Sequence, residues 1–151
     1  RIFMSNSLFL VEYGQTPDGK LIEETAHIIQ SAFIDQRLLE RLESDWGFNT
    51  TSILEEEDSE ETIEIKHLDD KKIHEVYDYF FDAFKKLIIK ANDRLQALAQ
   101  ENVLTTQGSN HKSQFDFNDV EQFRVLTNLI AILKIKIEQY NGSNTVFLKV
   151  G

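Results

Sequence analysis

Residues 68–91 constrain the fold of this chain more than any other stretch. Their apolar side chains recur at steps of three and four, at Ile73, Val76, Tyr77, Phe80, Phe81, Phe84, Leu87, Ile88 and Ala91. That spacing places them on one wide face of an α-helix. Asp69 can cap the first amides, and Leu68 and Ile73 occupy the two positions of a hydrophobic staple. The face is too bulky for a solvated helix, so it predicts the spine of a hydrophobic core.

The helical pattern continues to Gln100. A straight helix from Asp69 to Gln100 would be about 48 Å long at 1.5 Å per residue. A compact domain of this chain length has a diameter of roughly 40 Å. Asn92 and Asp93 offer a cap in the middle of the pattern, so we expect a break or kink there.

Before this stretch, an unbroken apolar run predicts a buried strand over residues 8–13, and Pro17, Asp18 and Gly19 predict a turn over 14–20. Residues 21–44 show apolar steps of three and four, which predict a helix ending at Gly47, with Trp46 as a packing residue. Residues 50–54 and 62–66 predict a hairpin of two strands. Between these two strands, residues 55–61 predict a mobile loop, because like charges repel and cannot bury apolar surface.

After the long helical pattern that ends at Gln100, residues 102–113 are polar and predict a loop, with Phe115 and Phe117 as anchors. A last helix is expected from near Asn118, where Glu121 can complete a capping box, and it should end at Gly142. Residues 145–150 predict a closing strand that shares a sheet with the first. Phe80, Phe84, Phe123 and Ile130 are expected in one interior.

Together these elements predict a single α+β domain over residues 1–151. Three to four helices should pack on a small mixed or antiparallel sheet that includes the N- and C-terminal strands. The 151 residues suffice for one core.

The composition excludes some classes of function. The net charge is −10, and residues 1–68 carry all of it, with 15 acids and 5 bases. Such a chain repels phosphates, so we expect no direct nucleic-acid binding. The absence of cysteine fits a reducing compartment, and no signal peptide or apolar run near 20 residues is visible, so a cytoplasmic protein without membrane contact is expected.

Few residue patterns point to chemistry. The six glycines form neither a dinucleotide loop nor a P-loop, and no histidine pair has the spacing of a helical zinc site. His67, Asp69, Asp70 and His74 cluster locally and could serve an acid–base or metal site, but we favour a capped helix start with solvated charges. Asp78 and Asp82 stand one turn apart and read as a wet helix face, and residues 116–119 lack the later ligands of a calcium loop. We therefore expect no catalytic residue, metal or cofactor.

The acidic run suggests a binding function. A flexible anionic segment can steer a basic protein partner and speed association. The candidate contacts are Glu55, Glu56, Glu57, Asp58, Glu60 and Glu61, with Glu40, Glu43 and Asp45 as secondary contacts. The hypothesis is a non-catalytic acidic module, such as an inhibitor or an immunity-type antitoxin that covers a basic site. The alternatives are an enzyme with a site around His67 and His74, and a structural or self-assembling phage or secretion component.

The order of elements resembles that of the YfbM-like family of small uncharacterised bacterial proteins. The resemblance rests on the strand and helix that lead to Trp46, on residues 67–70 before the amphipathic helix, on Asn92-Asp93 opening a short helix, and on a final helix followed by residues 145–150. The proline expected near Asp70 and the aromatic-proline pair expected around residues 103–105 are absent. The resemblance implies an α+β fold and no activity.

Overall fold

The chain begins with a long β-hairpin. In the computed structural model, which describes residues 6–104 and 117–151, strand β1 (Ser7–Gln15) pairs antiparallel with β2 (Leu21–Phe33). The turn between them is closed by the Thr16 amide, which donates to the Lys20 carbonyl at 2.8 Å, and Gly19 adopts a φ of +92°. Positive φ favours glycine, and the turn predicted over residues 14–20 is confirmed over residues 16–20, because Gly14 and Gln15 belong to β1.

The helix predicted over residues 21–44 is wrong in its first half. Residues 21–33 form β2, and only helix α1 (Gln36–Asp45) matches the prediction. Ile22, Ile29 and Phe33 fit helical steps, but β-branched and aromatic residues also favour strands. Pairing along the whole of β1, from Ser7–Phe33 to Gln15–Leu21, decides the outcome, and this partner is invisible to a pattern within one segment.

Five strands close into a barrel in the order β1-β2-β3-β4-β5, rather than forming the open sheet that we expected. Strands β3 (Phe48–Leu54) and β4 (Thr62–Leu68) form the predicted hairpin. Strand β5 (Val146–Val150) pairs antiparallel with both β1 and β4, which confirms that the first and last strands share a sheet. A single parallel pair, Ile22–Leu54, joins β2 to β3 and completes the barrel.

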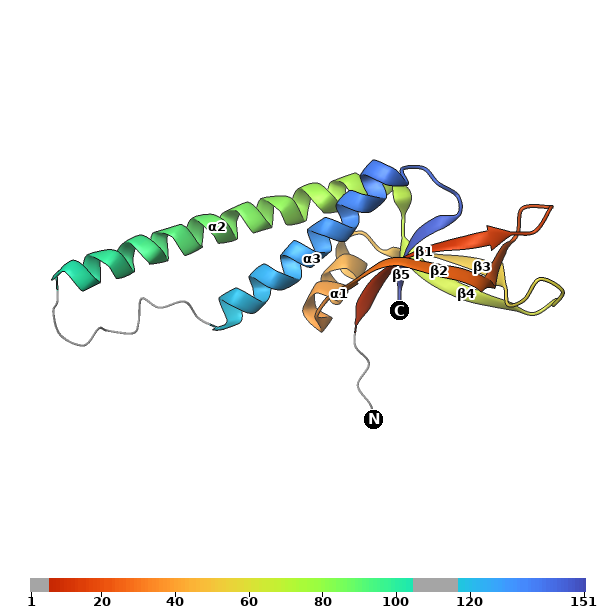
Figure 1. Ribbon diagram of the computed structural model, residues 1–151, viewed down its shortest axis with the longest axis horizontal. Coiled ribbons are helices and arrows are strands. Elements are labelled where there is room, and N and C mark those ends of the chain that lie inside the picture. The colour runs from red at the N-terminus through yellow and green to blue at the C-terminus, as the bar shows by residue number, and fades with distance from the viewer. Residues whose placement is uncertain (1–5, 105–116) are drawn as a thin grey trace, which may run out of the picture.

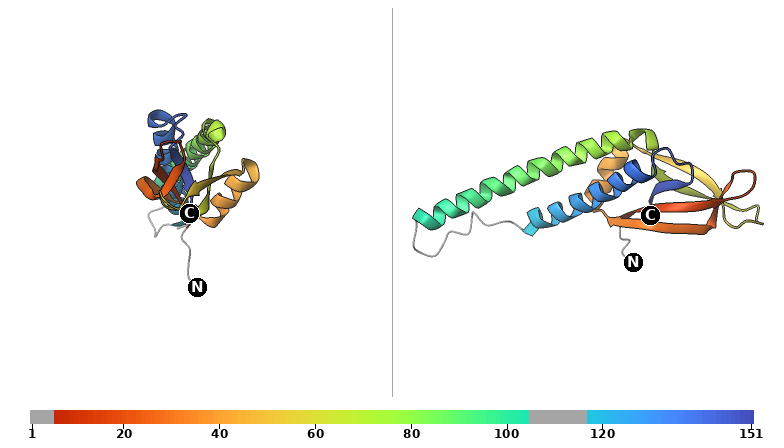
Figure 2. Two further views of the ribbon diagram at one scale, coloured as in Figure 1. Left: turned by 90° about the vertical axis from the view of Figure 1, so that its right-hand side faces the viewer. Right: turned by 45° about the horizontal axis from the view of Figure 1, so that its top comes forward.

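A helical arm leaves the barrel between β4 and β5 (Figure 1). A short 3₁₀ turn, η1 (Asp70–Lys72), leads into α2 (Ile73–Leu104), and α3 (Phe117–Gln139) returns beside it. The break expected at Asn92-Asp93 does not occur, because α2 runs through both residues. A break would be needed only in a compact molecule, whereas α2 projects beyond the barrel and beyond the start of α3 (Figures 1 and 2). Among the described residues, no α-helix combines the length and the apolar composition that a membrane span needs.

The main core lies where the arm meets the barrel. It joins Leu10 and Leu148 of the barrel to Val76 and Phe80 of α2 and to Leu133 of α3. A second cluster fills the far end of the barrel, around Tyr13 and Ile65. Of the four residues expected in one interior, Phe80 and Ile130 are buried and Phe84 is half-buried, but Phe123 is 39% exposed. Phe123 lies on the part of α3 that has left the barrel.

Element ends follow the predicted capping chemistry. The Asp69 carboxylate accepts from the Lys71 amide at 3.1 Å, and both Leu68 and Ile73 are buried. Gly47 and Gly142 take positive φ just past α1 and α3, as a left-handed helix end requires. The Glu121 carboxylate accepts a hydrogen bond from Arg124 at 2.8 Å. Its predicted capping partner Asn118 has a side chain outside the described residues, so the capping box stays a prediction. The predicted anchor Phe115, the side chain of the second anchor Phe117 and most of the predicted loop also lie outside what the structure describes.

Candidate functional site

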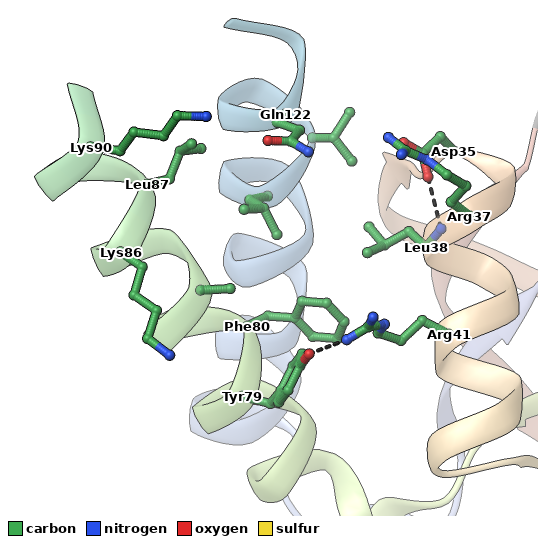
Figure 3. Close-up of a pocket in the computed structure, with 13 residues that line it drawn as sticks. Asp35, Arg37, Leu38, Arg41, Tyr79, Phe80, Lys86, Leu87, Lys90 and Gln122 are labelled. Carbon is green, nitrogen blue, oxygen red and sulfur yellow. Dashed lines mark hydrogen bonds between the residues drawn. The ribbon is translucent and has the colours of Figure 1, made fainter. Parts of the chain in front are cut away.

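A pocket of about 500 Å³ lies between α1, α2 and α3 (Figure 3). We call it the helical groove. Its interior is apolar: Phe80 and Val125 are buried, and Leu38, Leu87 and Leu126 are half-buried. Pockets of about 300–1,000 Å³ with apolar walls and a few polar groups are typical of ligand sites. The groove therefore has the size and lining of a binding site.

Cationic side chains surround the opening of the helical groove. Arg37 and Arg41 come from α1, and Lys86 and Lys90 come from α2 (Figure 3). Asp35 is the one carboxylate in the lining, and its Oδ1 accepts from the Leu38 amide at 2.8 Å as the cap of α1. Lys86 also lies 3.2 Å from the exposed carboxylate of Asp82. The lining thus carries a net charge of +3 in a chain whose net charge is −10.

An aromatic wall closes one end of the helical groove. The Arg41 guanidinium donates a hydrogen bond to the Tyr79 hydroxyl, and its Cζ lies 5.6 Å from the Tyr79 ring centroid. Trp46 packs behind this contact, 5.4 Å from the Tyr79 ring and 5.8 Å from the Phe80 ring. The packing role predicted for Trp46 is confirmed, and its indole lies next to two groove residues.

The acidic run lies at the opposite end of the molecule. Residues 55–61 connect β3 to β4 at the barrel end away from the arm (Figures 1 and 2). The Glu55 amide donates to the Glu61 carbonyl at 3.0 Å, and the Glu61 amide donates to the Ser59 hydroxyl at 2.9 Å. All six carboxylate residues of this loop are exposed. Its position at the hairpin tip is as predicted, and its mobility stays a prediction.

The secondary acidic contacts are not part of the same surface. Glu40, Glu43 and Asp45 are exposed on α1, which lies beside the arm, away from the loop along the long axis (Figures 1 and 2). Glu43 lies 3.9 Å from Lys66, and Glu40 accepts a hydrogen bond from Gln36. The nine predicted residues therefore form two separate groups.

The histidine cluster is also divided. His67 is buried in β4, whereas His74 is exposed on the first turn of α2. Asp70 holds Lys136 instead: its Oδ1 accepts from the Lys136 ammonium, and its Oδ2 accepts from the Gly142 amide at 3.0 Å. Among the described residues, no group of three or more His, Asp or Glu side chains is arranged to hold a metal. Lys136 was not among the predicted site residues. Its place on an apolar stripe of the last helix, three residues after Leu133, was a visible signal of a buried charge.

His67 is held in its neutral form. Its Nδ1 lies 3.2 Å from the Leu68 carbonyl oxygen, so this nitrogen carries the proton, and Nε2 accepts from the Thr51 hydroxyl at 2.7 Å. Burial lowers the pKa of His67 below its usual 6.5, more than the Leu68 carbonyl and the nearby Asp69 raise it. The Phe147 ring packs edge-on against the imidazole at 4.7 Å. The geometry is that of a structural histidine in the barrel wall.

We predict that stability falls when the pH drops below 6.5. The unfolded chain protonates His67 there, while the folded chain resists protonation because its pKa is lowered. Above pH 6.5 both states are neutral at this residue, so the loss begins near 6.5 and ends at the folded pKa. The urea midpoint should be lower at pH 5.5 than at pH 7.5, and His67→Gln should reduce the difference. An unchanged difference between the two pH values in His67→Gln would contradict the prediction.

Comparison with protein-family models, with curated proteins and with solved structures gives no match for this chain. The fold alone therefore defines the class of this protein. It is an α+β chain in which a five-stranded barrel carries a projecting pair of helices. The resemblance to the YfbM-like family stays a prediction.

Proposed function

We propose that this protein is a non-catalytic protein-binding module whose acidic loop, residues 55–61, covers a basic site on a partner. An inhibitor or an immunity-type antitoxin works in this way. The observation that carries the proposal is the state of the six loop carboxylates. All are exposed, and none forms an ion pair with another residue in the part of the chain that the structure describes.

The shape of the loop supports the same proposal. Backbone hydrogen bonds between Glu55 and Glu61 and between Ser59 and Glu56 hold the seven residues in a closed turn. Carboxylates on such a turn repel one another, and a cationic partner would relieve that repulsion. The turn stands at the tip of a hairpin, where a partner can reach it without contacting the arm (Figure 1).

Affinity capture with matched variants tests the proposal. The loop variant carries Glu57→Gln, Asp58→Asn and Glu60→Gln, and the control carries Glu75→Gln, Asp78→Asn and Glu138→Gln. Each variant loses three exposed carboxylates, so the change in net charge is the same. We expect wild-type and control baits to retain the same basic protein from the native host and the loop variant to lose it. Equal retention by all three baits would contradict a role for the loop.

A second candidate function, self-assembly, is favoured by an apolar strip on the arm. We define the apolar strip as Phe81, Ile88 and Leu95 of α2 with Phe123 of α3. These side chains are 38%, 42%, 51% and 39% exposed. The three α2 residues recur every seven positions, the spacing at which one helix packs along another. Ring contacts continue the strip inward, with Tyr77 stacked on Phe81 at 5.7 Å and Phe84 beside Phe123 at 5.0 Å.

If the apolar strip joins copies of this chain, the average molecular mass of the protein in solution should rise with protein concentration. Ile88→Glu with Leu95→Glu should return the protein to a monomer, since charges in an apolar contact are costly. Both sites are exposed, so the free energy of unfolding should change by only about 0.5 kcal/mol each. Sedimentation equilibrium measures the mass. A wild-type monomer at every concentration would rule out this second candidate and leave the acidic-loop proposal untouched.

A further inference from the structure

The helical groove has the form of a helix bundle that lacks one member. Helix α3 lies along its base, and α1 and α2 stand on either side of it (Figure 3). Leu38 faces the groove from α1, Leu87 from α2 and Leu126 from α3, and all three remain half-buried rather than buried. A fourth helix in such a position would cover these side chains in the way that four-helix bundles cover their cores.

The charges of the groove form two rows. Arg37 and Arg41 stand four residues apart on α1, and Lys86 and Lys90 stand four residues apart on α2. Residues at that spacing lie one above the other on a helix face, so each wall carries a short column of cationic side chains, and on the α2 wall Lys86 also contacts the exposed Asp82 carboxylate at 3.2 Å. The apolar base lies between the two columns (Figure 3). Complementarity therefore requires acidic groups on both sides of an apolar stripe.

From this arrangement we propose that the helical groove binds an amphipathic α-helix of a partner protein that carries Asp or Glu on both flanks of its apolar face. Helix α1 has 10 residues and spans about 15 Å, so it limits the contact to two or three turns of the bound helix. The acidic loop cannot reach this groove in its own molecule, because it lies at the opposite end of the barrel (Figures 1 and 2). The groove is thus a second binding site, independent of the proposed function.

The occupant is a helix rather than the acidic loop of a second copy, for a reason of composition. Residues 55–61 contain no apolar side chain, so they would neutralise the walls but leave Leu38, Leu87 and Leu126 uncovered. A helix presents both kinds of group at once, with apolar residues at three- and four-residue steps and acids on either side.

Trp46 provides a direct readout. It is the only tryptophan, and its ring contacts Tyr79 and Phe80, which both line the groove. The probe is a synthetic helical peptide of about 15 residues with leucines on one face and glutamates on both flanks. A second peptide replaces every glutamate with lysine. Titration of the full chain should give a saturable change in Trp46 fluorescence with the acidic peptide, and binding at least about tenfold weaker with the basic one.

Matched variants locate the binding. Arg37→Glu with Lys86→Glu reverses one charge on each wall and should weaken the acidic peptide at least about tenfold. Lys71→Glu with Lys134→Glu makes the same charge change at exposed sites outside the groove and should leave the affinity within about twofold. The loop variant with Glu57→Gln, Asp58→Asn and Glu60→Gln should also bind normally, which separates this test from that of the proposed function.

Three outcomes would overturn the inference. The first is no saturable signal from the acidic peptide, and the second is equal binding of the two peptides. The third is saturation by decanoate, a small anionic amphiphile, at the same site without binding of the peptide, which would assign the groove to a small ligand instead.

Discussion

Replacing Leu133 with alanine should lower the free energy of unfolding by about 3 kcal/mol, within the 2–5 kcal/mol typical of buried leucines. Leu133 is fully buried in the cluster that joins α3 to the barrel and to α2. Removing three carbon atoms there loses their burial and leaves a cavity that rigid neighbours on two sides cannot fill. Urea unfolding followed by circular dichroism measures the loss.

The control for this substitution is Ile89→Ala. Ile89 is 61% exposed on the arm, so its truncation should change stability by no more than about 0.5 kcal/mol. Similar losses at the two positions would mean that the arm and the barrel do not share a core. That result would contradict the described junction between them.

Asp70→Ala should cost about 2–3 kcal/mol, because it leaves a buried ammonium without its carboxylate. The Lys136 side chain is 3% exposed, and its remaining contact would be the Tyr140 carbonyl at 2.9 Å. Asp70 itself is 37% exposed, which is why the expected cost lies below the full value for a buried pair. The same substitution also removes the acceptor of the Gly142 amide, so the end of α3 should loosen.

A double-mutant cycle with Lys136→Met separates these contributions. Lys136→Met alone should cost less than Asp70→Ala, because methionine suits the apolar surroundings and water can still reach Asp70. The double variant should lie only slightly below Lys136→Met in stability, because the unpaired ammonium is then absent and only the acceptor of the Gly142 amide is lost in addition. Strictly additive losses would show that the ion pair contributes nothing beyond its separate members.

The parts of the fold that depend on local sequence were predictable. The turn at Gly19, the cap at Asp69 and the helix ends at Gly47 and Gly142 all depend on residues within a few positions of each other. Clean alternation around Ile63 and Ile65 likewise predicted β4. These features are decided by the conformational preferences of single residues and by short-range hydrogen bonds.

The features that depend on distant partners were not predictable. Strand β2 owes its conformation to β1, and barrel closure rests on one parallel pair between Ile22 and Leu54. The break predicted in α2 was wrong, because it was inferred from the diameter of a compact domain and the molecule is elongated (Figure 2). The residue pattern within one segment does not indicate which distant segment will pair with it in a sheet.

The candidate sites divide in the same way. A run of six acids within residues 55–61 is evident in the sequence, and only its place at the barrel tip required coordinates. The helical groove could not be found in advance, since it brings Arg37 and Arg41 beside Lys86 and Lys90 across two segments far apart in the chain. The region 21–44 that supplies α1 was also expected to be one long helix, which would have placed these arginines elsewhere.

Two surfaces of opposite charge thus lie at different places on one small protein. The acidic loop at the barrel tip suits a basic protein surface, and the basic walls of the helical groove suit an acidic helix (Figures 1 and 3). Because the two lie apart, a single protein could engage two partners at once. The variants described for each surface separate the two contacts.

The salt dependence of binding to the basic partner tests the central claim most directly. The dissociation constant should be measured at 50 mM and at 500 mM NaCl, for wild type and for the variant with Glu57→Gln, Asp58→Asn and Glu60→Gln. Exposed charges are screened beyond about 4 Å at the higher salt and beyond about 14 Å at the lower. We predict that wild type weakens at least about tenfold across this range and the variant much less. An affinity of wild type that is the same at both concentrations would contradict binding through the acidic loop.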